Sequence, residues 1–578
     1  MARQEVHFEI FIRQGAKGGW KLHDVVEQRD LAIAVAQEMM AEERATGVKI
    51  IKETYSPETG DYLTLKIYED GHNKFQSDPK AEDVPSAMLC FKPDDLYSYH
   101  ARATLSRLLI DFLTRQKLTV TELIHRSDAL EKFEATGTLY QHAVQKIAVA
   151  QASSTKKPVQ QIMKELNDLA TKAINRVYRD ERRKYFPEVE AGSFAALADR
   201  LTGEADGGYV LNGAIAKHLR SAQGWEEKLV RLLAIMEECS GDSASAQLLL
   251  ASVDTIAAEI LTGSAALHEL IGSHENLGDA LSTLTHLFLG QMRPDASPSQ
   301  GVLSLTRRFA DDQLQSARTA IANRIMAELK SPKKLGGETL LDEIAILRRL
   351  ANKLVLGQGK YLSHEDLIAA FTMRSKRLVT YETLARFLEP IIDPDEKVES
   401  LLKVEEGVIG AENKRQIAAA VLPIVSSAAF VNQFQANAPP ALTRLQRLMA
   451  LQTSVLRSGM QENQKQEIAH ALDKLASEVE LRAKVMASID RKPVSHVEKV
   501  MALLDLYTCA ALTEGSLSAK GREIVLAYLA KPGFLTEYVA HVTREGTQAP
   551  ADAIKAEFIQ MLEKAGITPA SGLRLVAA

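Results

Sequence analysis

The sequence predicts a mainly α-helical protein that carries a small α+β module at its N-terminus. Three observations support this fold class. In residues 6–68, apolar side chains alternate with polar ones, which is the period of strands with one buried face. From about Leu96 to Gly566, amphipathic segments follow one another, separated by glycine, proline and capping residues. Near the C-terminus two of these segments recur in the same order. We therefore expect the long all-α region to consist of stacked helical hairpins.

The composition is typical of a folded, soluble chain. Of 578 residues, 46% are hydrophobic and 25% are charged, whereas disordered chains are depleted in apolar residues. The formal net charge of −5 creates no overall positive field, so nucleic acid is an unlikely partner class. The 3 cysteines form no Cys-x-x-Cys pair, and they indicate a reducing compartment with neither disulfides nor a zinc site.

Membrane insertion is not expected either. The N-terminus lacks the long apolar stretch of a secretory signal. The apolar run 418–431 contains a proline and two serines, and it is shorter than the ~20 residues that cross a bilayer. We expect a cytoplasmic protein without a transmembrane segment.

Residues 1–71 predict the α+β module. Val6, Phe8, Ile10 and Ile12 alternate along the first segment, as in a strand with one buried face. The expected order is strand, strand, helix, strand, strand (ββαββ), with the elements at residues 6–13, 20–25, 31–45, 48–55 and 61–68.

Glycines 15, 18 and 19 raise the question of a phosphate loop. A phosphate cradle opens directly into a helix, whose free amides hold the anion. Here Trp20 to Val25 forms another alternating segment, so we predict that the glycines join two strands of a hairpin.

The module's helix is expected to begin after Asp30 as its cap and to cover the sheet with Leu31, Val35 and Met39. Trp20 has two interpretations. It fills the gap between sheet and helix, which we consider the better explanation, or it forms a contact site for a partner or an anion. The basic neighbours of Trp20 in that contact site are Arg13, Lys17 and Lys21.

Residues 72–95 read as a polar, proline-containing linker. Two helical regions are expected after it, at residues 96–300 and 301–578. A helix beginning after Pro158 could run to Phe186, and the glycine pairs 207–208 and 336–337 are expected to separate helices.

A repeat supports the stacked arrangement. "RQIAAAVLPI" from Arg415 is echoed by "QEIAHALDKL" from Gln466, and "RLMAL" from Arg447 is echoed by "KVMAL" from Lys499. The offsets are 51 and 52 residues, as expected for a repeated helical hairpin. The closest general comparison is a degenerate HEAT-like solenoid, and an irregular helical bundle is the alternative.

No local motif identifies a reaction: Walker, nucleophile-elbow, zincin, kinase and calcium-loop patterns are not found. Two Glu-x-x-His pairs, Glu122 with His125 and Glu467 with His470, have the spacing of di-iron ligands, but we expect surface or core roles. We expect the same of His268, His274 and His286, because "IGSHEN" between the first two reads as a loop. Neither a metal nor a cofactor is predicted.

A basic run ends the long helix that follows Pro158. Arg176, Arg179 and Arg183 lie near aromatic residues and could contact phosphates, yet interspersed acids favour a solvated helix end. After Pro550, a stripe of apolar residues predicts a docking or capping helix: Ile554, Phe558, Met561 and Leu562.

These features favour a cytoplasmic, non-enzymatic scaffold or adaptor, of the kind used in signal transduction. It would bind protein partners along its helices and use the N-terminal module as a second contact or regulatory element. One alternative is a regulator that senses a small anionic or nucleotide ligand at the glycine loop or the arginine cluster. Another is an enzyme whose active site is assembled from dispersed helices.

Overall fold

The computed structural model describes residues 6–14, 20–42, 44–56, 61–70, 88–190, 192–238, 241–293, 299–357, 359–546 and 548–568. By compactness the chain divides into two units. The first is Met1–Thr104 with Tyr140–Ala170, and the second is Leu105–Leu139 with Thr171–Ala578.

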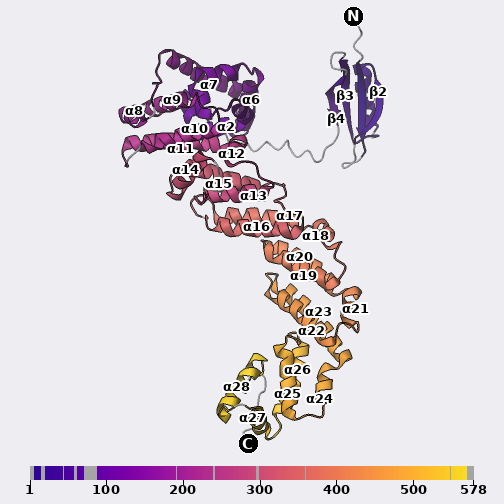
Figure 1. Cartoon of the computed structure of the whole chain (residues 1–578). Helices are drawn as coiled ribbons and strands as arrows, with labels where there is room; N and C mark the ends of the chain where they lie inside the picture. The colour runs from indigo at the N-terminus through magenta and orange to yellow at the C-terminus, as the bar shows by residue number, and fades with distance from the viewer. Residues whose placement is uncertain are drawn as a thin grey trace. The chain divides into compact units, whose positions relative to one another are not determined.

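The first unit contains a four-stranded antiparallel sheet in the order β2-β1-β3-β4 (Figure 1). The strands and the helix between them are β1 (Val6–Arg13), β2 (Lys21–Val26), α1 (Arg29–Ala41), β3 (Gly47–Ser56) and β4 (Asp61–Asp70). This confirms the predicted ββαββ order.

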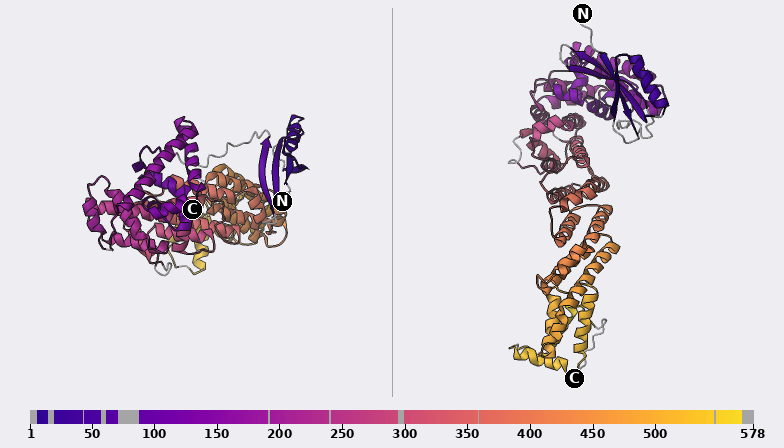
Figure 2. Two further views of the ribbon diagram at one scale, coloured as in Figure 1. Left: turned by 90° about the horizontal axis from the view of Figure 1, so that it is seen from above. Right: turned by 90° about the vertical axis from the view of Figure 1, so that its right-hand side faces the viewer.

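Helix α1 lies along one face of the sheet (Figure 2). Ile10 and Ile50 are fully buried beneath Ala32 and Ala36, which are also 0% exposed. Alanines on the inner face bring the helix backbone close to the sheet. Of the predicted covering residues, Val35 and Met39 do pack against this core, whereas the prediction is wrong for Leu31, which is 50% exposed.

The start of α1 also differs from the expectation. Gln28 occupies the N-cap position and no side chain caps the helix, whereas Asp30 lies inside the first turn. A carboxylate in the first turn still interacts favourably with the helix dipole, which explains why Asp30 resembled a start signal.

The predicted hairpin is confirmed by the antiparallel pairing of β1 with β2. Residues 15–19 themselves lie outside the described residues. The ladder is irregular, because Ile10 pairs with Asp24 but Phe11 pairs with Leu22. His23 is thus an extra residue in β2. Because of this bulge, the β2 side chains before His23 lie on the opposite face of the sheet from the one that simple alternation predicts.

Beyond β4 the described elements are all helical. They are η1 (Pro93–Tyr97), α2 (Tyr99–Leu108), α3 (Ile110–Gln116), α4 (Val120–His125), α5 (Ser127–Glu134), α6 (Thr138–Thr155), α7 (Val159–Arg182), α8 (Phe194–Leu201), α9 (Gly207–Leu219), α10 (Trp225–Glu237), α11 (Ala244–Thr262), α12 (Ser264–Ile271), α13 (Leu277–Phe288), α14 (Gln300–Ala310), α15 (Gln315–Lys330), α16 (Leu340–Val355), α17 (His364–Leu378), α18 (Tyr381–Leu388), α19 (Pro394–Gly407), α20 (Ala411–Val425), α21 (Ala428–Gln435), α22 (Ala441–Arg457), α23 (Glu462–Ala483), α24 (Val485–Asp490), α25 (His496–Thr508), α26 (Ser516–Leu529), α27 (Phe534–Arg544) and α28 (Ala551–Lys564).

From α16 onward the second unit repeats one pattern of two packed helices followed by a third (Figure 1). The first helices α16, α19 and α22 pack on one another in turn, and so do the second helices α17, α20, α23 and α26. Neighbouring pairs therefore bury each other's apolar faces, and the predicted stacking of helical hairpins is seen.

The sequence echo coincides with this stacking. Ile417 on α20 and Ile468 on α23 are 0% and 1% exposed, and Leu448 on α22 and Val500 on α25 are 0% and 1% exposed. The echoed residues are thus equivalent core positions of successive hairpins.

Two predicted helix boundaries require correction. Gly207 and Gly208 begin α9 instead of separating helices. At Gly207 a Cβ atom would lie 2.3 Å from the carbonyl oxygen of Leu201, so only glycine fits this close approach. Helix α7 ends at Arg182, four residues before Phe186. The pair 336–337 does separate α15 from α16, with φ values of 143° and 80°.

Carboxylates join packed helices through the helix N-termini. Asp254 on α11 accepts hydrogen bonds from the backbone N–H groups of Ser316 and Ala317, both at 2.9 Å, at the start of α15. Asp473 on α23 does the same for α26. Each acid satisfies free amides at the start of a packed helix that is distant in the sequence.

One described helix, α11, is long and apolar enough to cross a membrane, and α20 with α21 passes the same test as a pair bent by 56°. Half of the α11 window is buried, and α11 packs against α8, α10 and α15. That packing is typical of a core helix.

Candidate functional site

A groove with a volume of about 810 Å³ lies beside α17 and α18. We call it the basic groove. The segment between α15 and α16, the start of α16, helices α17 and α18, and the residues after α18 form its walls. Its lining residues are Pro332, Lys333, Lys334, Glu338, Thr339, Leu340, Glu343, Arg374, Arg377, Leu378, Thr383, Arg386, Phe387, Pro390 and Ile391.

Two arginines of α17 hold the wall formed by the α15–α16 connection. Arg374 is 3% exposed and donates to the carbonyl oxygens of Leu329 at 2.8 Å and Lys333 at 2.7 Å. Arg377 donates to the carbonyl of Ser331 at 2.5 Å. These bonds satisfy carbonyls at the C-terminal end of α15, where positive charge is favoured.

Glu343 anchors the same connection from the opposite side. Its carboxylate accepts the backbone N–H of Leu335 at 2.9 Å and lies 3.9 Å from the Arg374 guanidinium. The Leu335 carbonyl in turn accepts the N–H of Gly278 at 2.6 Å. Burial lowers the pKa of Arg374, and the nearby Glu343 carboxylate offsets part of this decrease. The wall is therefore fixed before anything binds.

The basic groove has an excess of positive charge. Five cationic side chains and two carboxylates line it, which gives a formal charge of +3 on a chain whose net charge is −5. Lys333 and Arg386 are exposed, and within the described ranges neither is in an ion pair. Between these charges lie apolar side chains, including Leu340 and Phe387.

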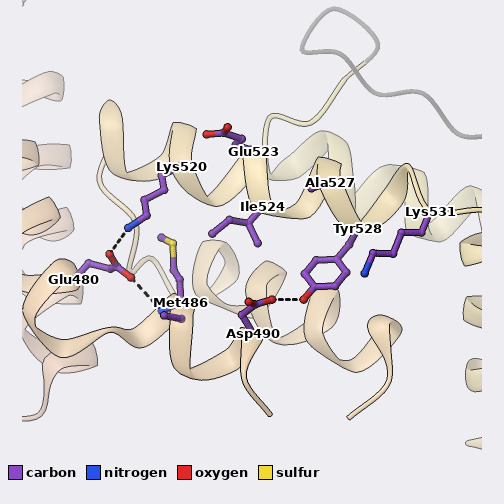
Figure 3. A pocket seen from close by; sticks show the side chains of 10 residues that line it. Glu480, Met486, Asp490, Lys520, Glu523, Ile524, Ala527, Tyr528 and Lys531 are labelled. Carbon is purple, nitrogen blue, oxygen red and sulfur yellow. Dashed lines mark hydrogen bonds and ion pairs between the residues drawn. The ribbon is translucent and has the colours of Figure 1, made fainter. Parts of the chain in front are cut away.

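A second groove, of about 550 Å³, lies between α23, α24 and α26 (Figure 3). Lys520 reaches Glu480 at 2.8 Å, and the hydroxyl of Tyr528 donates to the Asp490 carboxylate. The ammonium of Lys531 lies 4.4 Å from the centroid of the Tyr528 ring.

The charges of this second groove are largely paired within it. Its lysines and carboxylates sum to a formal −1, from Lys520 and Lys531 against Glu480, Asp490 and Glu523. Burial and the bond to Asp490 raise the pKa of Tyr528 to about 12. Tyr528 therefore stays protonated at neutral pH, and it acts as a hydrogen-bond donor, not as a base.

The predicted N-terminal contact residues separate onto different faces of the sheet. Trp20 lies on the face opposite α1, where Arg13 and Lys49 each approach its ring to 5.1 Å. Lys21 pairs with Ile12 and so belongs to the α1 side. Lys17 lies outside the described residues.

The expectation that Trp20 fills the gap between sheet and helix is wrong. The bulge at His23 is the physical reason, because simple alternation would place Trp20 on the same face as Val26, which packs in the core beneath α1. Lys49 was not predicted from the sequence to lie here, and β3 brings it next to Trp20 and Phe11.

The arginine cluster of α7 is engaged mainly within the protein. Arg176 contacts Asp206 at 3.1 Å and Asp180 at 3.6 Å, and its guanidinium stacks 4.0 Å from the Tyr209 ring centroid. Arg179 pairs with Asp180 at 3.0 Å. Arg183 is exposed. The structure does not bring these arginines together around one anion-sized site.

The two Glu-x-x-His pairs lie on different helices, α4 and α23. Glu122 is fully buried and accepts hydrogen bonds from Lys228 at 2.5 Å and Arg126 at 2.8 Å. These two charged partners account for the burial of the Glu122 carboxylate. Glu467 and His470 are exposed.

The histidines near residue 270 also have separate surroundings. His274 contacts the Thr283 hydroxyl at 2.9 Å, and His286 contacts the Lys353 ammonium at 2.7 Å. His268 is exposed on α12. The predicted loop is confirmed between α12 and α13, and the neighbouring Glu269 accepts the N–H of Trp225 at 2.7 Å.

The C-terminal stripe packs as predicted. Ile554, Phe558 and Leu562 are at most 2% exposed, and the Phe558 ring lies 4.2 Å from that of Tyr538 on α27. Helix α28 is thus docked on α27.

The basic groove was not predicted from the sequence. The adjacent cations in "SPKKLGG" were a visible signal, but Arg377 and Arg386 join them only through packing of α17 and α18. No protein-family model, no curated protein and no solved structure matches the chain.

Proposed function

We propose that this protein is a cytoplasmic scaffold whose stacked helical hairpins bind a protein partner at the basic groove. The observation that carries the proposal is the groove's combination of size, fixed wall and unbalanced positive charge. A surface of this kind is what an α-helical array offers to partners.

The occupant that fits is an acidic segment of a partner protein that also carries large apolar residues. Its carboxylates would meet Lys333, Lys334 and Arg386 at the rim, and its apolar side chains would contact Leu340 and Phe387. Exposed rim charges contribute mainly to specificity and association rate, and apolar contacts contribute more of the affinity.

The second groove supports this choice by contrast. Its cations already contact Glu480 and the Tyr528 ring, so an acidic segment would gain little there. The location in the cytoplasm is part of the proposal, and the free thiols of Cys90 and Cys509 agree with it.

A displayed library of random peptides, selected on the full chain, tests the proposal. We expect the enriched peptides to be rich in Asp and Glu and to contain large apolar residues. Binding of the best of them should weaken by about tenfold or more in a Lys333→Glu/Arg386→Glu double variant, because two attractive charges become repulsive. It should also weaken as salt is raised.

Lys376→Glu is the matched control, since Lys376 is exposed on α17 but does not line the groove. This variant should bind the selected peptides like the unmodified chain. Selection without enrichment, enrichment of peptides without acidic bias, or equal binding to the double variant would each disprove the proposal. If no acidic peptide binds but a free nucleotide does, the result would instead favour a small anionic ligand.

A further inference from the structure

The face of the N-terminal sheet opposite α1 carries three side chains of types that bind metals. His7 and Glu9 project from β1 on this face, and Glu53 lies directly opposite His7 in the β1–β3 register. All three are partly buried. Paired strands position these side chains more firmly than a loop would.

The distances between these groups suit a single ion. The candidate ligand atoms of His7, Glu9 and Glu53 all lie within 4.8 Å of one another, and His7 Nε2 lies 3.4 Å from Glu53 Oε2. Bonds to zinc are about 2.0–2.2 Å long, so two ligands of one ion are at most about 4.4 Å apart. Small rotations of the side chains are enough to close the site.

The charge of the cluster matches a divalent cation. With a neutral imidazole, the two carboxylates give the cluster a formal charge of −2, and their mutual repulsion falls when a cation lies between them. Two cations of the same face, Arg13 and Lys49, lie over the Trp20 ring, towards the other end of β1. An imidazole nitrogen with two carboxylate oxygens is a ligand set for first-row divalent metals, not for Ca²⁺ or Mg²⁺.

We propose that His7, Glu9 and Glu53 form a binding site for one divalent transition-metal ion, with Zn²⁺ as the best match. Three protein ligands leave a fourth position of a tetrahedral ion for water or for a group from a bound partner. The N-terminal module then offers a partner a metal-centred contact that is independent of the basic groove.

Isothermal titration of the full chain with Zn²⁺, and of a second sample with Co²⁺ followed by visible absorption, tests the site. We expect one equivalent to bind and the d–d bands of a low-coordinate Co²⁺ ion to appear. His7→Ala and Glu53→Gln should each weaken this binding by at least about tenfold, since removal of even a supporting group costs that much. Affinity should fall in acid, because the imidazole must be unprotonated to bind.

His470→Ala is the matched control, because it removes an exposed histidine next to a glutamate on α23. It should leave the Zn²⁺ affinity unchanged. Glu9→Gln provides a second, nearly isosteric variant in case His7→Ala perturbs the sheet, which far-UV circular dichroism would reveal. No Zn²⁺ binding by the full chain, or binding that His7→Ala, Glu9→Gln and Glu53→Gln leave unchanged, would overturn the proposal.

Discussion

Replacing Asp473 by alanine should loosen one end of the helical array and leave the rest intact. Asp473 is 3% exposed on α23. It accepts the hydroxyl of Thr513 at 2.7 Å, the N–H and hydroxyl of Ser516 at 2.6 and 2.7 Å, and the N–H of Leu517 at 3.3 Å. The substitution removes the acceptor for the first turn of α26.

The expected loss of stability depends on which of the hydrogen-bond donors to Asp473 stay buried after the substitution. Loss of a side chain that caps a helix costs about 0.5–2 kcal/mol. Thr513 is fully buried, and its unpaired hydroxyl adds about 1–3 kcal/mol, whereas Ser516 is exposed and can bond to water. We therefore expect a loss of about 3 kcal/mol in the local free energy of unfolding, or roughly 100-fold in an opening equilibrium.

Hydrogen–deuterium exchange measured by mass spectrometry is the assay. In a stack, each pair of helices is stabilised by its neighbours, so amides of α26–α28 should exchange about 100-fold faster while α10, α11 and α15 stay protected. Glu467→Ala, a change of an exposed residue on the same helix, is the control. It should change the local free energy of unfolding by no more than about 0.5 kcal/mol. Equal loss of protection along the whole second unit, or less than about tenfold change in α26, would refute the reasoning.

Two further changes test other parts of the chain. Gly213→Ala should destabilise the protein by about 1–3 kcal/mol in urea unfolding, because its Cβ would lie 2.1 Å from the buried ring of Phe186. At Gly208 in the same helix an added Cβ would lie 3.9 Å from the Leu248 side chain, so Gly208→Ala should be neutral or stabilising by up to about 1 kcal/mol. Equal destabilisation by both substitutions would contradict the packing argument. Burial, then Lys353, lowers the pKa of His286 below its ordinary value of 6.5. The unfolded chain therefore takes up a proton first on acidification, and stability should fall as the pH drops below about 6.5. In urea unfolding at pH 7.5 and 5.5, His286→Gln should reduce the loss of stability between the two pH values. An unchanged loss would contradict the role given to His286.

The elements with a clear period were predictable, and the faces that they present were less so. Alternation identified β1 and its buried residues Phe8 and Ile10, since a strand period of two is a local property. The face of Trp20 was not predictable, because it depends on a bulge that appears only when β1 and β2 pair. The centre of the inner face of α1 was not predicted, because the small alanines at 32 and 36 pack closest to the sheet, with Val35 and Met39 beside them, whereas hydrophobicity favoured the larger Leu31.

The amino-acid sequence by itself determined the order and kind of the elements, because strand and helix periods, turn residues and the 51- and 52-residue echo are all written along the chain. Only the tertiary structure decided which charges meet. It paired the buried Glu122 with Lys228, and it gathered Lys333, Arg377 and Arg386 around one groove. Charges interact through space over a few ångströms, and that proximity arises from the packing of helices that are tens of residues apart in the sequence.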